Sequence, residues 1–384
     1  MKKILIGLLI GVVVISLILG GCAKSEPAPG APAPSAAPVP TAAPAPAPKP
    51  APKPAPTSAP AAGKTIVWKA ASDMTASNAN SEIRWWAEEM EKRTNGQFKV
   101  KFYWGGQLGR EPTYPEGLKT GLYEMADVVA LHYTNAMPIS NMAFLPGVPP
   151  DDFESYSKFL FALQEYQPYK DELAQFNMVP VVDCLFGPYE LMGNKKVKTT
   201  SDLKGLRVRL GPPKGSLYSY FGASLTMIPG TEVYDALSRG ILDMASFSWT
   251  NAYVRQKIYE ISKYATINTG AGPLHHSWCS TKEAWDALPA EFKSISKELT
   301  AQIPAQVAAP KFVDEMKKDL VLFEQRKIEV FKFSDADRAK MDEAARITSE
   351  AYLKAIEGQG KPVRKWYDWL LAKKAEIEAA AKKK

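Results

Sequence analysis

Two arginines in one short stretch are the residues best suited to bind a charged ligand. In LRVRL (206–210), apolar and charged residues alternate. On a β-strand this alternation places Arg207 and Arg209 on one face and the apolar side chains on the other. Such a pair is usual on a solvated sheet edge, but at the end of a strand that faces a cleft a guanidinium binds a carboxylate through two parallel hydrogen bonds. The stretch is therefore a candidate carboxylate site.

Residues that would perform catalysis or bind a metal are sparse. The histidines are His132, His275 and His276, and no cysteine or carboxylate stands beside them at metal-ligand spacing. Neighbouring strand residues point to opposite faces, so His275 and His276 cannot chelate one ion. The sequence has no P-loop, no dinucleotide-binding glycine pattern and no serine-nucleophile elbow, and GPPKG (211–215) indicates a turn. We expect neither an enzyme nor a cofactor.

The first 21 residues have the layout of a secretory signal. Lys2 and Lys3 precede an apolar run (4–19), which closes on small residues directly before Cys22. This arrangement resembles a bacterial lipobox, in which the signal is cleaved before the cysteine and the cysteine carries lipid. The run is shorter than the ~20 residues of a membrane span. We therefore expect residues 1–21 to be a signal peptide and Cys22 to anchor an extracytoplasmic protein to a membrane.

Residues 22–63 are expected to form an unfolded tether, and residues 64–384 the folded part. Residues 25–62 contain 14 prolines and almost no bulky apolar side chain. Such a segment cannot bury enough surface to offset its ordering entropy, and alternating proline favours an extended polyproline helix. The formal net charge of +7 is modest, and the cationic residues of the folded part are interleaved with acids. We therefore expect no nucleic-acid partner.

Two cysteines remain in the folded part. Cys184 and Cys279 each lie in an apolar stretch, VVDCLF and HSWCS. In an oxidising compartment they could form one disulfide, or they could be buried as small unbonded hydrophobic residues. The sequence leaves both alternatives open.

The order of predicted elements indicates an α/β fold. Strand-like runs at 65–71, 97–104 and 124–132 alternate with helical patterns at 77–94 and 114–120. This series predicts a largely parallel sheet covered by helices on both faces. A second α/β unit and a helical C-terminal part follow; their expected strands are 178–186, 205–210, 224–228, 241–247, 274–280 and 327–333, and their expected helices are 213–221, 232–239 and 335–381.

The ends of the expected strands supply further candidate contacts. Ligands of open α/β sheets bind beyond the carboxyl ends of the strands. Ser72 and Asp73 follow the first strand, and His132 and Tyr133 follow the third. We therefore expect these four side chains to face a ligand, although Asp73 could instead cap a helix and His132 could simply pack.

Three stretches resemble the signatures of the solute-binding proteins of TRAP (tripartite ATP-independent periplasmic) transporters. They are TNGQFKVKFYWGGQLGREP (94–112), NKKVKTTSDLKGLRVRL (194–210) and IPGTEVYDALSRGILDM (228–244). The resemblance covers residues 65 to about 355. It implies a two-lobed α/β periplasmic-binding-protein fold with a ligand cleft between the lobes, and a long C-terminal helix (289–327) packing across both. It further implies delivery of an organic acid to TRAP-type membrane permease subunits.

The resemblance also implies roles for single residues. The family's carboxylate-binding arginine corresponds to Arg209, and Arg207 is then structural. Where many members have a second arginine this chain has Tyr189, and where many have an asparagine it has Phe247, followed by Trp249. The missing cation argues against a second ligand carboxylate, and the rings favour an apolar or aromatic ligand body. The alternative is that Phe247 and Trp249 are ordinary core residues.

The expected lobes are discontinuous in sequence. Lobe I is expected to contain residues 64–186 and 242–275, and lobe II residues 187–241 and 276–384. The resulting prediction is an extracytoplasmic solute-binding protein that captures a monocarboxylate by lobe closure and delivers it to a TRAP-type transporter. A tethered receptor that senses a ligand without transporting it is the alternative from another class, and a secreted hydrolase is a third.

Overall fold

The computed structural model describes most of the expected folded part, namely residues 65–74, 76, 81–248 and 252–382. The predicted signal peptide, the tether, Cys22 and Trp249 lie outside these residues. Among the helices of the described ranges, none combines the length and the apolar character needed to cross a membrane.

The first of two sheets has five strands. In spatial order they are β2 (Phe98–Tyr103), β1 (Ile66–Ala71), β3 (Met125–Val128), β10 (Leu274–Thr281) and β4 (Met178–Phe186). Strands β1, β2 and β3 are parallel, as the sequence predicted, whereas β10 runs antiparallel to both β3 and β4. The expectation of a largely parallel sheet is therefore correct only for the first three strands, because β10 enters this sheet from the opposite direction.

The second sheet has six strands. In spatial order they are β11 (Glu329–Lys332), β9 (Tyr264–Ile267), β5 (Tyr189–Gly193), β8 (Met244–Ser248), β6 (Arg207–Arg209) and β7 (Ser224–Thr226). Strand β6 is parallel to β7 and β8, while β5 is antiparallel to β8 and β9. Strands β5 and β9 were not predicted. All five residues of β5 are buried, so the strand lacks the alternation that marks a half-buried strand.

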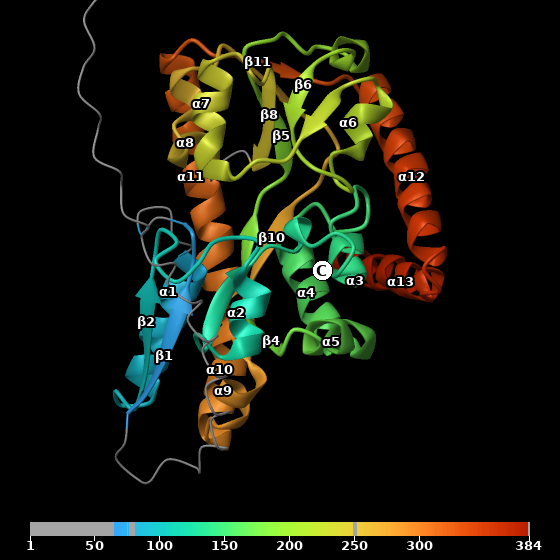
Figure 1. Ribbon diagram of the computed structural model, residues 1–384. Coiled ribbons are helices and arrows are strands. Elements are labelled where there is room, and N and C mark those ends of the chain that lie inside the picture. The colour runs from blue at the N-terminus through green and yellow to red at the C-terminus, as the bar shows by residue number, and fades with distance from the viewer. Residues whose placement is uncertain (1–64, 75, 77–80, 249–251, 383–384) are drawn as a thin grey trace, which may run out of the picture. The chain divides into compact units, whose positions relative to one another are not determined.

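We call the first sheet with its helices lobe I and the second sheet with its helices lobe II (Figure 1). The expected division placed residues 242–275 in lobe I and residues from 276 onward in lobe II, which is wrong for three strands. Strands β8 and β9 pair within the lobe II sheet, and β10 pairs within the lobe I sheet. The error arose because strand pairing is decided by long-range hydrogen bonds, which local alternation in the sequence does not reveal.

Helices cover the lobe I sheet. They are α1 (Ser81–Arg93), α2 (Tyr114–Thr120), α3 (Pro138–Met142), α4 (Phe153–Glu165), α5 (Gln167–Ala174) and α9 (Lys282–Asp286). In α1 the buried residues Ile83, Trp86 and Met90 recur at helical spacing and form one apolar stripe. The helix ends before Asn95 and Gly96, whose φ angles of 51° and 77° are left-handed.

A long helix joins the two lobes. Lobe II itself has the short helices α6 (Ser216–Tyr220), α7 (Val233–Ser238) and α8 (Ala252–Arg255). The long helix consists of α10 (Ala290–Ile303), one π-helical turn (Pro304–Ala308) and α11 (Ala309–Gln325). Helix α10 packs against α1 and β4 of lobe I, and Glu315 of α11 forms an ion pair of 3.1 Å with Arg255 of lobe II. The predicted helix across both lobes is therefore confirmed.

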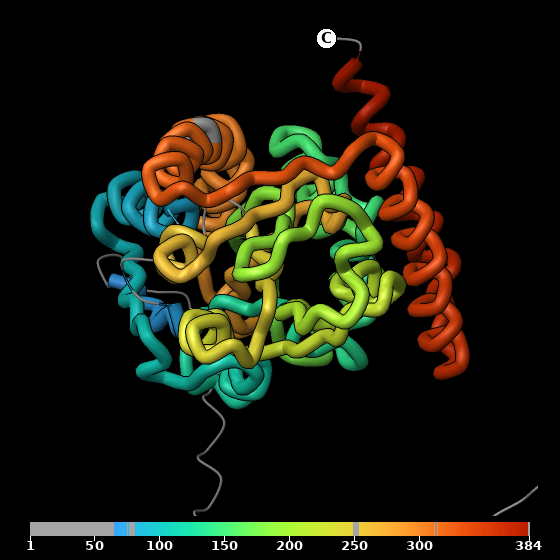
Figure 2. Tube along the Cα trace, turned by 90° about the horizontal axis from the view of Figure 1, so that it is seen from above, coloured from blue at the N-terminus to red at the C-terminus, as the bar shows by residue number. Residues whose placement is uncertain are grey.

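Two further helices form a strap over the lobes. Helix α12 (Asp335–Glu357) packs against α6 of lobe II, and α13 (Val363–Ala381) packs against α4 of lobe I (Figures 1 and 2). At the lobe I end, the rings of Tyr166 and Trp369 stack with their centres 3.9 Å apart. Between these points, the hydroxyl of Tyr352 donates to the carbonyl oxygen of Thr134 at 3.3 Å.

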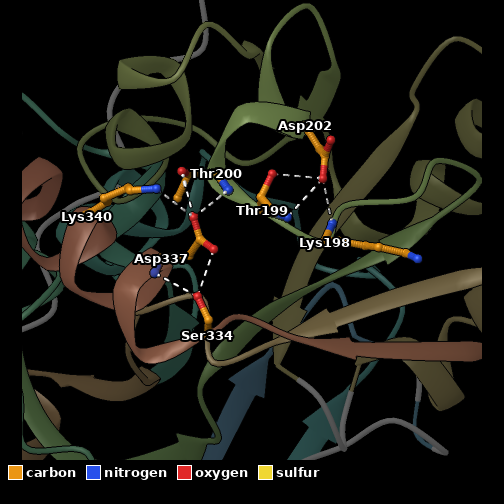
Figure 3. A network of polar contacts seen from close by, with 7 residues as sticks. All are labelled: Lys198, Thr199, Thr200, Asp202, Ser334, Asp337 and Lys340. Atoms are coloured by element: carbon orange, nitrogen blue, oxygen red, sulfur yellow. Dashed lines mark hydrogen bonds and ion pairs between the residues drawn. The ribbon is translucent and has the colours of Figure 1, made fainter.

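A polar network fixes the start of α12 to lobe II (Figure 3). Ser334 caps the helix, because its hydroxyl oxygen accepts a hydrogen bond from the backbone N–H of Asp337 at 3.1 Å. The carboxylate of Asp337 accepts from the hydroxyl of Thr200 at 3.1 Å and pairs with Lys340 at 3.1 Å. Thr200 lies on the 3₁₀ turn η3 (Thr200–Leu203), so these bonds join α12 to the segment that precedes β6.

The two described cysteines form no disulfide. Cys184 on β4 and Cys279 on β10 are both buried. In the antiparallel pairing of these strands Cys184 lies opposite His276, and Cys279 lies opposite Pro180. Of the two alternatives left open by the sequence, the structure therefore supports buried thiols.

Candidate functional site

Arg209 is a buried cation on β6 of lobe II. Its side chain is 5% exposed, and its Nε and Nη2 atoms donate to the carbonyl oxygen of Ile228 at 3.2 and 3.0 Å. Burial lowers the pKa of Arg209 to about 10, which still leaves it charged at neutral pH. No carboxylate of the described residues forms an ion pair with it. Because a guanidinium has five N–H donors, Arg209 retains donors for an anionic ligand.

Arg207 has a different environment. It forms a two-point ion pair with Asp243, with Nη2 to Oδ1 at 2.8 Å and Nε to Oδ2 at 2.9 Å. Half of its side chain is exposed. The hydrogen bonds from Arg207 hold the pKa of Asp243 below its usual value. The guanidinium of Arg207 is thus already paired, which agrees with the structural role that the resemblance implied.

Two aromatic rings accompany Arg209. Tyr189 begins β5 and Phe247 lies on the neighbouring strand β8, and their ring centres are 6.3 Å apart. The Arg209 guanidinium lies 4.1 Å from the centre of the Phe247 ring, within the range of a cation–π contact. Burial raises the pKa of Tyr189 to about 12, although the nearby charge of Arg209 opposes the shift. The structure therefore brings together three of the predicted ligand contacts.

Phe247 also belongs to the core of lobe II. It is 6% exposed, and its ring meets the ring of Tyr253 edge to face at 6.2 Å. Phe247 is thus both a core residue of lobe II and a neighbour of the Arg209 guanidinium.

The lobe I candidates lie beside a cluster of three carboxyl groups, Asp73, Glu111 and Asp127, which we call the acid cluster. The hydroxyl of Ser72 donates to Asp127 at 3.1 Å. Burial, and next the charge of Asp127, raises the pKa of Asp73. Burial likewise raises the pKa of Glu111 well above its usual value, and the other two carboxylates add to the shift. A second negative charge brought to this cluster would meet repulsion.

His132 and Tyr133 follow β3, but not as predicted. The expected strand to residue 132 is too long, since β3 ends at Val128 and residues 130–132 form the 3₁₀ turn η2 (Ala130–His132). Burial, and then the charges of Arg209 and His276, lower the pKa of His132 to about 4. His132 is therefore a neutral side chain of lobe I that lies close to the buried cation of lobe II.

Tyr133 is directed to the acid cluster. Its hydroxyl donates to the carboxyl of Glu111, whose other oxygen accepts from the backbone N–H of Val129 at 2.8 Å. The hydroxyl of Tyr133 is thus already engaged by a group of its own lobe.

Sequence reasoning missed several polar residues of the site. Glu111 lies in one of the family-like stretches, and Asp127 is a lone carboxyl in the apolar run MADVVA, which could have marked it. His276 Nδ1 lies 3.3 Å from Asp127 Oδ1. Lys214, within the GPPKG turn, is fully buried, and no local pattern indicated this.

The side chains of this site are suited to bind a ligand. The site offers a buried cation, aromatic surface and hydrogen-bonding groups of both lobes. Within the described ranges, no group of histidine, cysteine and carboxylate side chains is arranged to hold a metal ion. His275, the other histidine of β10, points away from the acid cluster and bonds the Tyr156 hydroxyl at 2.8 Å, so the two histidines do face opposite sides as predicted.

Comparison with known proteins agrees with a binding role. A family model described as bacterial extracellular solute-binding protein, family 7, matches residues 72–355. A monocarboxylate 2-oxoacid-binding periplasmic protein of Nostoc sp. is 27% identical over 225 residues, which span 56% of this chain and 60% of that relative. A solute-binding protein of Albidiferax ferrireducens is 22% identical over 74% of this chain and 77% of its own length.

Solved structures of TRAP solute-binding proteins share the fold. One from Rhodoferax ferrireducens in complex with copurified benzoate has a TM-score of 0.73 and 19% identity, covering 83% of this chain and all of that chain. One from Desulfovibrio salexigens with bound orotic acid has a TM-score of 0.71 and 22% identity, covering 81% of this chain and 99% of that chain. The matches confirm the resemblance and the two-lobed fold expected from the sequence. The chain therefore belongs to family 7 of the bacterial extracellular solute-binding proteins.

Proposed function

We propose that the protein binds a monocarboxylate with an apolar or aromatic body and delivers it to the membrane permease subunits of a TRAP-type transporter. Arg209 is the residue that carries this proposal. Its guanidinium is buried, and no carboxylate of the described chain forms an ion pair with it. A ligand carboxylate that accepts from its free N–H groups would supply the missing counterion in a charge-assisted, two-point contact.

The ligand body is assigned from the rings around Arg209. Tyr189 and Phe247 offer adjacent aromatic surface next to the cation, and such surface favours flat or apolar groups. The benzoate found with the Rhodoferax protein is an acid of this kind. A related structure from a marine metagenome, with a TM-score of 0.72, is described as specific for aromatic acid ligands. These ligands belong to those proteins, and they support the same class of acid here.

The acid cluster supports a single carboxylate in the ligand. Burial, and then the charge of Asp127, raises the pKa of both Asp73 and Glu111. A second ligand carboxylate directed to this side would add repulsion between like charges, which costs several kcal/mol when the groups are desolvated.

Capture is proposed to occur by closure of the lobes. Arg209, Tyr189 and Phe247 belong to lobe II, whereas Ser72, Asp73, His132 and Tyr133 belong to lobe I. A ligand that contacts both sets binds the closed arrangement more tightly than the open one, and that difference drives closure. The closed form would then dock to the permease.

Anchoring is proposed through Cys22. The signal-like segment that ends at Cys22 supports a lipidated N-terminus, with the proline-rich tether holding the binding lobes away from the membrane. Fractionation of wild type and Cys22→Ser tests this point. We expect only wild type in the membrane fraction, and equal release of both proteins would contradict it.

Identification of the bound acid tests the main proposal. Mass spectrometry of small molecules released from the purified protein should detect a monocarboxylate. Calorimetry should then show tighter binding of benzoate than of terephthalate, which has the same ring and a second carboxylate. Tighter binding of terephthalate would overturn the monocarboxylate assignment, and absence of binding by any organic acid would overturn the proposed function.

A further inference from the structure

Lys214 is a fully buried lysine in the turn that follows β6. Lysine is almost never fully buried unless it is paired with an acid. No carboxylate of the described residues lies within ion-pair distance of it. Instead, Nζ donates to the carbonyl oxygens of Pro273 at 2.9 Å and Phe144 at 3.4 Å. Burial of a lysine amine without an acidic partner costs free energy, so the position of this amine calls for an explanation beyond packing.

The two carbonyl groups belong to different parts of the fold. Phe144 lies in lobe I, shortly after α3, and its ring contacts His275 of β10 with 4.7 Å between the ring centres. Pro273 lies in the connection that leaves β9 of lobe II and enters β10 of lobe I. Lys214 itself belongs to lobe II. Its two hydrogen bonds therefore tie a lobe II turn to lobe I and to the connection between the lobes.

The same connection is bonded to Tyr189. The backbone N–H of Tyr189 donates to the carbonyl oxygen of Gly272 at 2.9 Å, one residue before the carbonyl that Lys214 binds. The Nζ atom of Lys214 also lies 5.5 Å from the centre of the Tyr189 ring. Gly272 has a φ of +72°, and a Cβ atom there would lie 3.8 Å from Lys214 Nζ. Lys214 and Tyr189 thus hold successive carbonyl groups of one interlobe segment.

We propose that Lys214 is a positioning residue of the ligand site, whose two hydrogen bonds fix the interlobe connection and so hold Tyr189 in its ligand-binding orientation. The inference rests on the proposed function, which assigns the Tyr189 ring to the ligand body. Lys214 acts through Tyr189 and does not touch the ligand. Because Phe144 and Lys214 belong to different lobes, their bond also contributes to the closed arrangement.

The protonation of Lys214 gives this role a measurable signature. Burial lowers the pKa of Lys214 to about 7, while the charge of Asp151 opposes the shift. The other titratable groups that face it are His275, whose pKa burial lowers to about 3, and Tyr189, whose pKa burial raises to about 12, so both are neutral. An uncharged amine has two N–H groups, which matches the two carbonyl oxygens that it meets.

The sign of the pH effect follows from this shift. When the lobes separate and water reaches the amine, its pKa returns toward the ~10.4 of free lysine. Closure therefore releases a proton, and rising pH favours closure. Between pH 6 and pH 8 this linkage predicts an increase in affinity of about tenfold, since the closed form titrates near pH 7 and the open form does not.

Calorimetry with benzoate at pH 6, 7 and 8 tests the proposal. Wild type should show the rise with pH. Lys214→Gln keeps two amide N–H donors but cannot titrate, so it should bind without that rise. Lys214→Met removes the donors and should bind about tenfold more weakly than wild type at pH 8. Lys204→Met, a change of an exposed lysine in the same lobe, should match wild type at each pH.

A second measurement needs no ligand. Hydrogen exchange of the Tyr189 amide should become at least tenfold faster in Lys214→Met than in wild type, with no change in Lys204→Met. Unchanged exchange at this amide would overturn the proposal, as would the persistence of the full pH rise in Lys214→Gln. Should Lys214→Met fail to fold, the pH series of Lys214→Gln decides the proposal. If wild type binds no acid, the proposed function fails, and the exchange data alone decide the role of Lys214.

Discussion

The guanidinium of Arg209 lies 4.1 Å from the centre of the Phe247 ring, and this contact follows from the strand register. Strands β6 and β8 are parallel, and Arg209 is paired with Ala245. Because side chains two residues apart on a strand share a face, Phe247 projects on the same side as Ala245. The cation and the aromatic surface of the proposed ligand site are therefore positioned by one pair of neighbouring strands.

Removal of the Arg209 guanidinium should abolish tight binding of the carboxylate. We expect Arg209→Ala to lose about 2–5 kcal/mol of binding free energy, because the ligand carboxylate would be buried without a partner. Arg209→Lys keeps the charge but loses the two-point geometry, so it should already bind more weakly than wild type. Titration calorimetry with benzoate measures both.

Arg207→Ala is the matched control for this pair. It removes the same chemical group two residues away, where the guanidinium pairs with Asp243 and is half exposed. Its affinity for benzoate should equal that of wild type. If instead Arg207→Ala loses binding and Arg209→Ala does not, the assignment within the strand is wrong.

Phe247 should determine preference for the ligand body. Phe247→Ala removes the ring beside Arg209, so affinity for benzoate should fall by more than affinity for acetate, which has the same carboxylate and no ring. We expect the loss of affinity for benzoate to be about tenfold larger than the loss for acetate, a difference of about 1.4 kcal/mol in binding free energy. Equal losses for both acids would mean that the ring stabilises the fold of lobe II and does not select the ligand.

The network at the start of α12 should stabilise the protein in a pH-dependent way (Figure 3). Hydrogen bonds, that of Ser334 first, lower the pKa of Asp337. A lowered carboxyl pKa contributes stability above the unfolded value of about 3.9, and this contribution is lost as the pH falls through the folded-state value. In urea unfolding, Asp337→Asn should therefore lower the free energy of unfolding by about 1–2 kcal/mol at pH 7, with a smaller difference at pH 3.

An exposed carboxylate of the same helix turn provides the control. Asp335→Asn makes the same chemical change at an exposed position. Its effect at pH 7 should be smaller than that of Asp337→Asn. Equal effects would indicate a general influence of negative charge at the helix start, without a specific role for the bonds to Thr200 and Lys340.

The strap helix α13 should contribute to stability although it lies beyond the family match, which ends at residue 355. The stack of Trp369 on Tyr166 is its clearest contact with lobe I. Trp369→Ala should lower the free energy of unfolding by about 1–3 kcal/mol, because it removes a partly buried ring and the stacking contact. Lys365→Ala, at an exposed position of the same helix, should leave the unfolding midpoint unchanged, and a similar midpoint for both variants would contradict docking through Trp369.

The sequence by itself determined the local elements and the class of the protein. The helical spacing in α1, the left-handed residues Asn95 and Gly96, and the nine-residue strand β4 are each visible over a few neighbouring residues. Periodicity and backbone preference act over such short ranges, so sequence patterns report them. The family-like stretches around Arg209 likewise indicate the solute-binding family without any knowledge of tertiary contacts.

Only the tertiary structure decided which strands pair and which charges meet. Strand β10 follows the connection from lobe II and inserts between β3 and β4 of the lobe I sheet. The expected placement of the residues from 276 onward in lobe II was therefore wrong for this strand. The same long-range path places His132 near Arg209 and Lys214 against Phe144. No local pattern marks these contacts, because the burial of a charge depends on the partners that the whole chain brings to it. The sequence could therefore nominate Arg209, but the role of Lys214 could be inferred only from the folded chain.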